Sequence, residues 1–281
     1  MATTMASEKI RIKAALTIAG SDPSGGAGIQ ADLKTFATIG VYGAAVITAL
    51  TAQNTMGVYG SVLVDPDFVR LQIRMVLEDI PIRFIKTGML GSSALVEVVA
   101  ESLPQKCVLV CDPVMYAKSG YPLLEKKAIE TLKSVLFPKA TIMTPNYPEL
   151  AELLGDSFHP DKPFENGKML LVLYPSLQAV VVKGGHREAK NGMVEDIIVY
   201  REEKNILTKT IYHPYISTNS THGTGCTLAS AITAYLAKGE DMISAITKAT
   251  EYVSFLIDKT REETYGHGHG PLPHHRFKES L

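Results

Sequence analysis

The feature that constrains the fold most is an alternation of short, almost wholly apolar runs with amphipathic segments. Each apolar run has Gly, Pro, Asp or Asn at or near its end; the runs are residues 14–20, 83–88, 108–114, 141–146 and 179–185. Strands that are apolar on both faces are typical of a parallel sheet that helices cover on both sides. The sequence therefore predicts an α/β fold with buried parallel strands.

The segments between these runs have helical periodicity, and they are residues 29–39, 66–79, 92–103, 125–136, 149–154 and roughly 165–174. Such an order predicts right-handed βαβ units and a doubly wound, mostly parallel central sheet with helices on both faces. Two stretches break the pattern: residues 44–65 suggest a small β flap, and residues 195–214 suggest a hairpin. Helices over 224–238 and about 242–262 complete the chain.

No linker divides the chain, so we expect a single domain over residues 1–281, with a flexible leader over 1–13. The net charge of −1 gives no electrostatic reason to expect a nucleic-acid or membrane partner. The leader lacks the apolar core of a secretory signal, and three cysteines are too few for a disulfide framework. We therefore expect a cytoplasmic protein.

Polar side chains follow several of the predicted strands. Asp112, Asn146, Glu149 and Lys183 each lie at a strand end or just after it. The C-terminal ends of parallel strands meet at one edge of a sheet, where ligands bind. Carboxylates there suggest Mg²⁺ held partly through water by Asp112 and Glu149, and a lysine suits a transferring phosphoryl group. Glu149 could instead be only a first-turn helix residue.

Residues 221–239 begin with small residues and run into a helical pattern, so they predict a helix N-terminus able to hold an anion. Together with the strand-end acids and Lys183, this makes phosphoryl transfer the leading class of reaction. Cys226 lies at the start of that helix. It could be a base whose pKa the helix lowers, an anion-site residue, or a small residue in a crowded turn.

For three further residues, a structural role is at least as well supported as a ligand-binding role. Asp32, one turn into the first helix, could bond a polar substrate or merely favour the helix N-terminus. Gln53 could match the edge of a heterocycle such as an aminopyrimidine, or be a turn amide. Met89 could lie against a flat ring, although a core methionine is the commoner case.

An ordered set of motifs runs through residues 15–227: ALTIAGSDPSGGAGIQADLKTF, ALTAQNT, KTGML, DPVM, TPNYPE, VVKGGH and THGTGCT. In this set the chain closely resembles the hydroxymethylpyrimidine/phosphomethylpyrimidine kinases of thiamine biosynthesis, in the ribokinase-like superfamily. The resemblance covers nearly the whole chain, and the order of the motifs is far more specific than any one of them.

The resemblance implies two ATP-dependent steps at one site, in which an aminopyrimidine alcohol becomes its monophosphate and then its diphosphate. It implies a pyrimidine pocket made by Gln53 with Gly20, Ala27, Asp32, Thr51, Met89 and Val114. It also implies an anion hole at Gly223, Thr224, Gly225 and Cys226, with Cys226 in the catalytic position. Asp112, Asn146, Glu149 and Lys183 would serve ATP and Mg²⁺.

Two other functions compete with this one. Pyridoxal kinases of related type share the first motif and the GxGCT end, although the intact ALTAQNT favours the pyrimidine. A non-catalytic vitamin sensor is a poorer fit, because it has no use for Lys183, Asp112, Glu149 and Cys226 together. Pairing of the flap across a two-fold axis would give a homodimer. The closing GHGHGPLPHHRF is expected to be a turn-rich loop with flexible histidines rather than a metal site.

Overall fold

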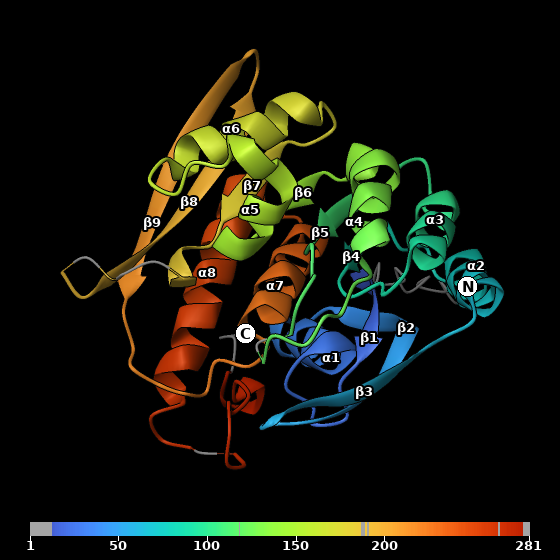
Figure 1. The fold of residues 1–281 in the computed structure, drawn as a ribbon, viewed down its shortest axis with the longest axis horizontal. Coiled ribbons are helices and arrows are strands. Elements are labelled where there is room, and N and C mark those ends of the chain that lie inside the picture. Colours follow the sequence, from blue (N-terminus) through green and yellow to red (C-terminus); the bar gives the residue numbers. More distant parts are fainter. Residues whose placement is uncertain (1–12, 118, 187–188, 190, 264, 278–281) are drawn as a thin grey trace, which may run out of the picture.

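A nine-stranded sheet forms the centre of the molecule, with helices on both faces (Figure 1). The computed structural model describes residues 13–117, 119–186, 189, 191–263 and 265–277, so residues 1–12 of the predicted leader lie outside it. The strand order is β3-β2-β1-β4-β5-β6-β7-β8-β9. Strands β2, β1, β4, β5, β6 and β7 pair in parallel, whereas β3, β8 and β9 are antiparallel to their neighbours. The predicted fold class is confirmed.

Five of the nine strands follow the predicted apolar runs, and the other four lie mainly in the segments predicted as a flap and a hairpin. The nine strands are β1 Ala14–Ser21, β2 Tyr42–Asn54, β3 Gly57–Leu63, β4 Phe84–Thr87, β5 Val108–Cys111, β6 Ile142–Met143, β7 Ala179–Val182, β8 Met193–Glu202 and β9 Asn205–Pro214. The last two form the predicted hairpin.

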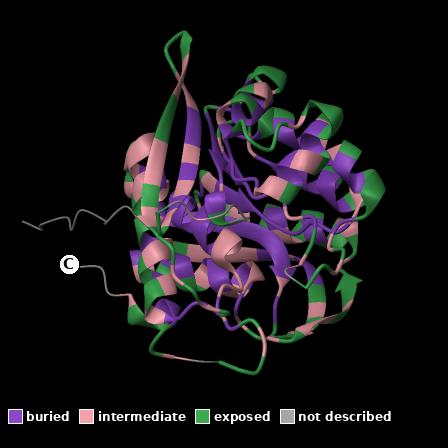
Figure 2. Cartoon of the chain, turned by 60° about the vertical axis from the view of Figure 1, so that its left-hand side comes forward, coloured by how far each residue is buried: buried purple, intermediate pink, exposed green. Residues whose placement is uncertain are grey.

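The helices form two layers because successive side chains of a strand point to opposite faces. Leu109 and Cys111 of β5 pack into one apolar cluster, and Val110 between them packs into another. The first cluster includes α2 Pro66–Asp79, α3 Ser93–Ser102, α4 Lys126–Thr131, α5 Tyr147–Leu154 and α6 Pro163–Leu173. The second includes α1 Gly28–Ile39, α7 Thr224–Lys238 and α8 Met242–Lys259. The buried sheet between these layers is visible in Figure 2.

Two helices differ from the prediction. The helix expected over 125–136 is α4 only as far as Thr131, and the chain continues as a π-helical turn and a 3₁₀ turn that contains Pro138. The helix expected at about 165 begins at Pro163 and is continuous. Its Gly167 is needed for packing, because a Cβ there would lie 2.6 Å from Cγ2 of Val199.

The flap is shorter than residues 44–65. Strand β2 first pairs in parallel with β1, so its N-terminal half belongs to the central sheet. From Ala49 to Asn54 it pairs with β3, and this antiparallel ribbon is the part that extends as a flap. A strand that continues from a sheet into a ribbon carries no break in its sequence pattern, which explains the difference.

The C-terminal segment closes over the flap turn. His269 donates its backbone N–H to the Thr55 carbonyl over 2.8 Å. The His274 side chain is buried, and its Nε2 lies 3.0 Å from the Thr227 hydroxyl oxygen. The expectation of flexible histidines is therefore wrong for these two. Among the described residues no group of three or more His, Cys, Asp and Glu side chains could hold a metal ion. No helix of the described chain has the length and apolarity that crossing a membrane requires.

Candidate active site

A cavity of about 640 Å³ lies at the predicted edge of the sheet, where β1, β4, β5 and β7 end near the start of α7. This volume is typical of a site for a small molecule or cofactor. Fourteen of the fifteen predicted site residues line it: Gly20, Ala27, Thr51, Gln53, Met89, Asp112, Val114, Asn146, Glu149, Lys183, Gly223, Thr224, Gly225 and Cys226.

Asp32 is the exception, and its predicted place in the substrate pocket is wrong. Its carboxylate is fully buried and pairs with Lys86 over 2.8 Å. It also accepts hydrogen bonds from Thr17 over 2.6 Å and from Ser230 over 2.5 Å. The pair joins α1, β4 and α7 below the cavity. Removing one partner of such a pair typically costs about 3–5 kcal/mol, because a buried charge is left alone.

The N-terminus of α7 forms one wall of the cavity. Gly223 precedes the helix with φ of 83°, and a Cβ there would lie 1.8 Å from the Gly26 carbonyl oxygen, so only glycine fits. No side chain caps this end. The first backbone N–H groups of a helix have no partner within it, and here they border a cavity. This end is therefore suited to phosphate oxygens.

Lys183 lies against the same loop. A Cβ on Gly225 would be 3.3 Å from Nζ of Lys183 and 3.5 Å from Oδ2 of Asp112. Nζ is 3.0 Å from Oδ1 of Asp112 and 3.8 Å from Oε2 of Glu149. Thr144 donates a further hydrogen bond to Asp112 over 3.0 Å. Two carboxylates and one lysine leave an excess negative charge beside the helix N-terminus.

Glu149 caps a helix and also borders the cavity, and its part in a Mg²⁺ site stays a prediction. It lies in the first turn of α5, where its carboxylate accepts the Asn146 N–H over 2.7 Å and Asn146 Oδ1 accepts the Glu149 N–H over 2.9 Å. This reciprocal pair is a capping box. The same carboxyl group also borders the cavity. Burial raises the pKa of Glu149 to about 7; Lys183 opposes that rise and Asp112 adds to it.

Cys226 lies in the first turn of α7 and is partly buried. Burial raises the pKa of its thiol to about 11; Lys86 acts against the rise, and the carboxylates of Asp32 and Asp112 reinforce it. The shift is opposite to the lowering expected at a helix N-terminus. The thiol is therefore neutral near pH 7, which disfavours a resting thiolate base.

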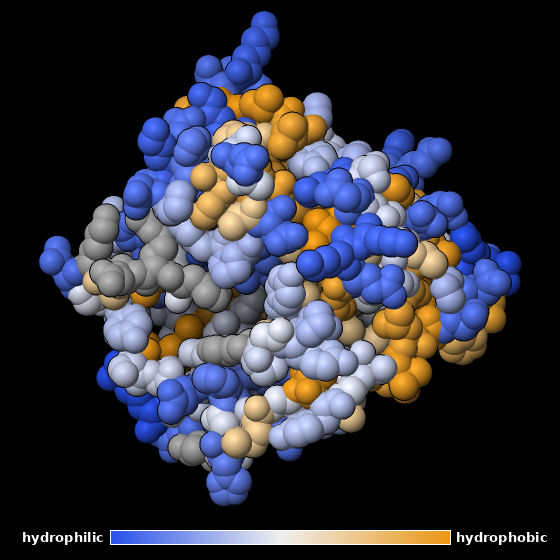
Figure 3. Space-filling view, viewed as in Figure 1, coloured by the Kyte–Doolittle hydropathy of each residue, from blue (hydrophilic) through white to orange (hydrophobic). Residues whose placement is uncertain are grey.

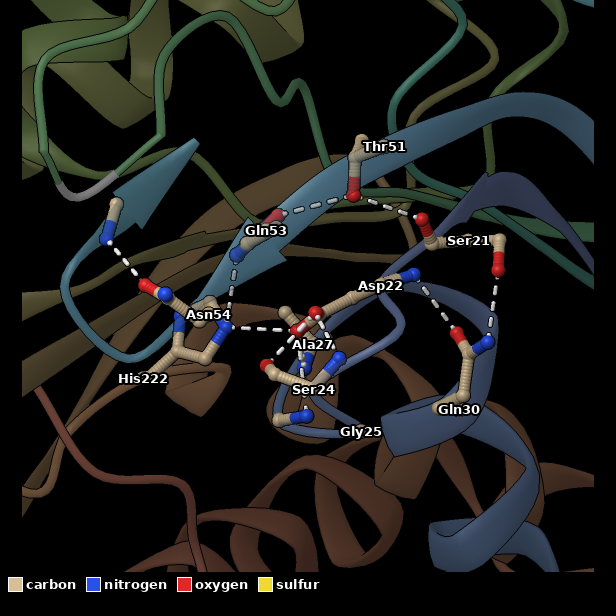
Figure 4. A network of polar contacts seen from close by, with 12 residues as sticks. Ser21, Asp22, Ser24, Gly25, Ala27, Gln30, Thr51, Gln53, Asn54 and His222 are labelled. Atoms are coloured by element: carbon tan, nitrogen blue, oxygen red, sulfur yellow. Dashed lines mark hydrogen bonds and ion pairs between the residues drawn. The ribbon is translucent and has the colours of Figure 1, made fainter. Parts of the chain in front are cut away.

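Two cavity residues, Asp22 and His222, were missed from the sequence (Figure 4). They meet across 200 positions of the chain, with 2.8 Å between Asp22 Oδ2 and His222 Nε2. Burial by itself would raise the pKa of Asp22, but hydrogen bonds from His222, Ser24 and Ala27 lower it to about 2. The available signals were the turn sequence SDPSGG and the histidine of THGTGC.

The wall near Gln53 combines polar and apolar groups. Gln53 Nε2 is 3.0 Å from His222 Nε2, and the Thr51 hydroxyl donates to the Ser21 carbonyl over 2.9 Å. Met89 packs so closely on β1 that a Cβ on Gly20 would be 2.9 Å from its sulfur. An amide beside a thioether suits a flat heterocycle with polar edges.

The fold and the site together define a small-molecule kinase with the ribokinase-like fold. The family model described as phosphomethylpyrimidine kinase matches residues 22–273. The hydroxymethylpyrimidine/phosphomethylpyrimidine kinase of Escherichia coli is 43% identical over 265 residues, covering 92% of this chain and 96% of that protein. The chain belongs to the phosphomethylpyrimidine kinase family.

Solved structures agree with this membership. The crystal structure of phosphomethylpyrimidine kinase from Clostridium difficile is 43% identical, with a TM-score of 0.75, and covers 88% of this chain and 100% of that one. Pyridoxal kinase from Staphylococcus aureus in complex with ADP is 29% identical, with a TM-score of 0.82, and covers 95% of this chain and 96% of that one. The ribokinase-like fold is thus shared by both kinds of kinase.

Proposed function

We propose that the protein phosphorylates 4-amino-5-hydroxymethyl-2-methylpyrimidine to its monophosphate, and then the monophosphate to the diphosphate, in thiamine biosynthesis. One observation carries the proposal: a single cavity holds both the Gln53 amide and the phosphate-binding groups around Lys183. The relatives named as hydroxymethylpyrimidine/phosphomethylpyrimidine kinases support the same substrate.

ATP is the proposed phosphoryl donor. A solved pyridoxal kinase of similar fold is described in complex with AMP-PCP, and another complex holds ADP. In this chain the groups suited to the nucleotide phosphates are Lys183 and the backbone N–H groups from Gly223 to Cys226, with Asn146 at the neighbouring strand end.

In the first step the hydroxymethyl oxygen forms a bond to the γ-phosphorus of ATP. The bond from that phosphorus to the bridging oxygen breaks, ADP leaves, and the hydroxyl proton passes to solvent. The transition state of such a transfer is loose, so positioning and charge stabilisation matter more than a strong base. Lys183 and the start of α7 provide that stabilisation, and the neutral Cys226 thiol leaves room for a substrate that already carries phosphate.

Asp112 and Glu149 fit a Mg²⁺ site that is completed by water and by phosphate oxygens. Their two carboxylates share one lysine, and the pKa of Glu149 is raised mainly by burial, with a smaller contribution from the nearby Asp112 carboxylate. A bound Mg²⁺ supplies positive charge that offsets the phosphate oxygens. Lys183 would then be freed from part of its pairing with Asp112.

Pyridoxal phosphorylation is the second candidate, because pyridoxal kinases share this fold closely. The TM-score of 0.82 with the Staphylococcus aureus enzyme exceeds the 0.75 of the Clostridium difficile phosphomethylpyrimidine kinase. The sequence identities rank the other way, at 29% and 43%. Substrate choice depends on side chains rather than on the overall fold, so identity carries more weight here.

We further propose that the protein is cytoplasmic and forms a homodimer through β3 and the adjoining helix. Strand β3 is one edge of the sheet, and its Tyr59 and Val62 are about 70% exposed, at 72% and 69%. Exposed Phe68 on α2 lies a few residues further along the chain. Figure 3 shows apolar surface on the side of the molecule formed by β2 and β3. An exposed apolar edge strand is usually covered by a partner.

A time course with the hydroxymethylpyrimidine and ATP tests the proposed function, with the monophosphate and diphosphate resolved by chromatography. The monophosphate is expected to rise first and then to fall as the diphosphate forms. Monophosphate that accumulates without conversion would reject the second step, and the absence of both products would reject the function.

A further inference from the structure

Gln53 lies between two polar partners on the cavity wall (Figure 4). Its Nε2 is 3.0 Å from Nε2 of His222, and its Oε1 is 3.3 Å from Oγ1 of Thr51. The oxygen and nitrogen of a side-chain amide have nearly the same shape. The hydrogens on the two partners therefore decide which end of the amide faces which partner.

The carboxylate of Asp22 fixes the proton of His222. Asp22 is an anion, since it accepts three backbone N–H groups and one hydroxyl, from Ser24, Gly26 and Ala27. Its Oδ2 lies 2.8 Å from Nε2 of His222. A contact this short between an anion and a ring nitrogen requires a hydrogen on that nitrogen. Nε2 of His222 therefore has no lone pair that could accept an amide N–H of Gln53, and all it can offer Gln53 is a share of the hydrogen that it donates to Asp22.

The backbone around His222 keeps the ring in this place. A Cβ on Gly26 would be 2.3 Å from Cδ2 of the ring and 3.0 Å from Cβ of Pro271, so the close approach needs glycine. The His222 backbone N–H is bonded to the Gly270 carbonyl over 3.0 Å. The ring thus cannot turn away from Asp22 without moving its neighbours.

Thr51 makes the opposite demand on the other end of the amide. Its hydroxyl hydrogen is directed to the Ser21 carbonyl over 2.9 Å, which is shorter than the 3.3 Å to Gln53. Oγ1 of Thr51 is left as an acceptor. A protonated nitrogen at His222 and an acceptor at Thr51 both favour the Gln53 oxygen toward His222 and its NH₂ group toward Thr51. This is the reverse of the orientation drawn in Figure 4, and it is reached by turning the amide through 180° in the same place.

We propose that Asp22 and His222, together with Thr51, lock the Gln53 amide in this orientation and so make the site selective for a 4-aminopyrimidine over its 4-oxo analogue. The inference rests on the proposed function. An aminopyrimidine edge has an acceptor nitrogen beside a donor amine, whereas the 4-oxo edge has a donor N–H beside an acceptor oxygen. A freely rotating glutamine matches either edge, but a locked one matches a single edge. Asp22 and His222 are then positioning residues.

Calorimetric dissociation constants for the hydroxymethylpyrimidine and its 4-oxo analogue test the proposal in the full chain. We expect the wild type to prefer the amino compound by at least about 100-fold, since a mismatched pair leaves buried polar groups unpaired. In His222→Phe the ring remains and its N–H is lost, so the preference should fall at least about tenfold. Thr51→Val removes the other director and should lower the preference in the same way.

Gln30→Ala is the matched control. Gln30 accepts the Asp22 backbone N–H over 2.9 Å and donates to the Ser21 hydroxyl over 2.7 Å, so it supports the same turn without contacting Gln53. The Gln30→Ala protein should prefer the amino compound by the same factor as the wild type. A preference that survives in both His222→Phe and Thr51→Val, or that is absent in the wild type, overturns the lock. Selective binding without product formation would instead reject the proposed function and leave the lock standing.

Discussion

Lys183 is the cation that pairs with both carboxylates of the site, Asp112 and Glu149. Replacing it by methionine removes the cation that pairs with the buried Asp112 and Glu149 carboxylates, and it removes the proposed donor to the transferring phosphoryl group. We expect kcat to fall at least about 100-fold and the melting temperature to drop. Steady-state kinetics and thermal unfolding measure the two effects.

Lys168→Met is the control for a lost lysine, because Lys168 is exposed on α6 and does not line the cavity. It should keep wild-type kcat. Normal turnover in folded Lys183→Met would exclude Lys183 from the chemistry.

Burial raises the pKa of the Cys226 thiol to about 11, and this sharpens the prediction for Cys226→Ser. A base would matter only for the first step, in which a hydroxyl attacks, and not for the second, in which a phosphate attacks. With a pKa of about 11, Cys226 has no thiolate at pH 7.5, so Cys226→Ser should slow both steps by a similar factor of about ten or less. Single-turnover rates for each step provide the measurement, with Cys107→Ser as the control. A loss confined to the first step would restore Cys226 as the base.

Topology explains why the strand-end residues of the site could be predicted from the sequence, whereas pocket residues such as Gly20, Thr51 and Val114 were implied by the family resemblance. Asp112, Asn146 and Lys183 each follow an apolar strand, and parallel strands place such residues at one edge. The place of Asp32 could not be predicted, because nothing local shows that Lys86 of β4 points inward toward it. A lysine inside the apolar run FIKTG was the available signal for a buried ion pair. The contact of Asp22 with His222 joins residues 200 positions apart, so no local sequence pattern predicts it.

At the scale of elements, the docking of the C-terminal segment makes the free energy of unfolding depend on pH, because it buries His274. Burial lowers the pKa of His274 to about 4, with Lys34 adding to the effect. In the unfolded chain the histidine titrates near 6.5, so between these values the unfolded state binds more protons. The stability that neutral His274 allows is present above about pH 6.5 and is lost as the pH falls toward 4, by up to roughly 3 kcal/mol.

Denaturant unfolding of the wild type and of His274→Phe from pH 4 to 7 measures this contribution. The variant should lose less stability on acidification than the wild type. The comparison between the two proteins is needed because the raised pKa of Glu149 contributes a slope of opposite sign over part of the same range. Equal slopes in the two proteins would show that His274 does not stay neutral in the folded state.

Elements were predicted best where tertiary contacts agree with local pattern. The bounds of α2, predicted as 66–79, match because Asp65 caps the helix and Pro66 begins it. The flap was predicted to begin at residue 44 but begins at about Ala49, because β2 changes its pairing partner within one uninterrupted strand. The C-terminal segment was expected to be flexible because glycine spacing says nothing of the Thr55 and Thr227 contacts that fix it.

At the scale of the molecule, the proposed dimer depends on the β3 edge. Val62→Lys places a charge on the exposed apolar face of that strand and should turn a dimer into a monomer at micromolar concentration. Sedimentation velocity measures the change. Thr208→Lys places the same charge on exposed β9, the opposite edge of the sheet, and should remain dimeric. A wild-type monomer, or a dimer lost only in Thr208→Lys, would contradict the β3 interface.

The proposed function requires the cavity to select an aminopyrimidine rather than pyridoxal as the substrate for phosphoryl transfer. Competition between equal concentrations of the hydroxymethylpyrimidine and pyridoxal, with ATP and resolved products, gives the ratio of the two kcat/KM values directly. We predict a ratio of at least about 100 in favour of the pyrimidine, since the locked Gln53 amide matches its edge. Pyridoxal phosphate as the main product would contradict the proposed function.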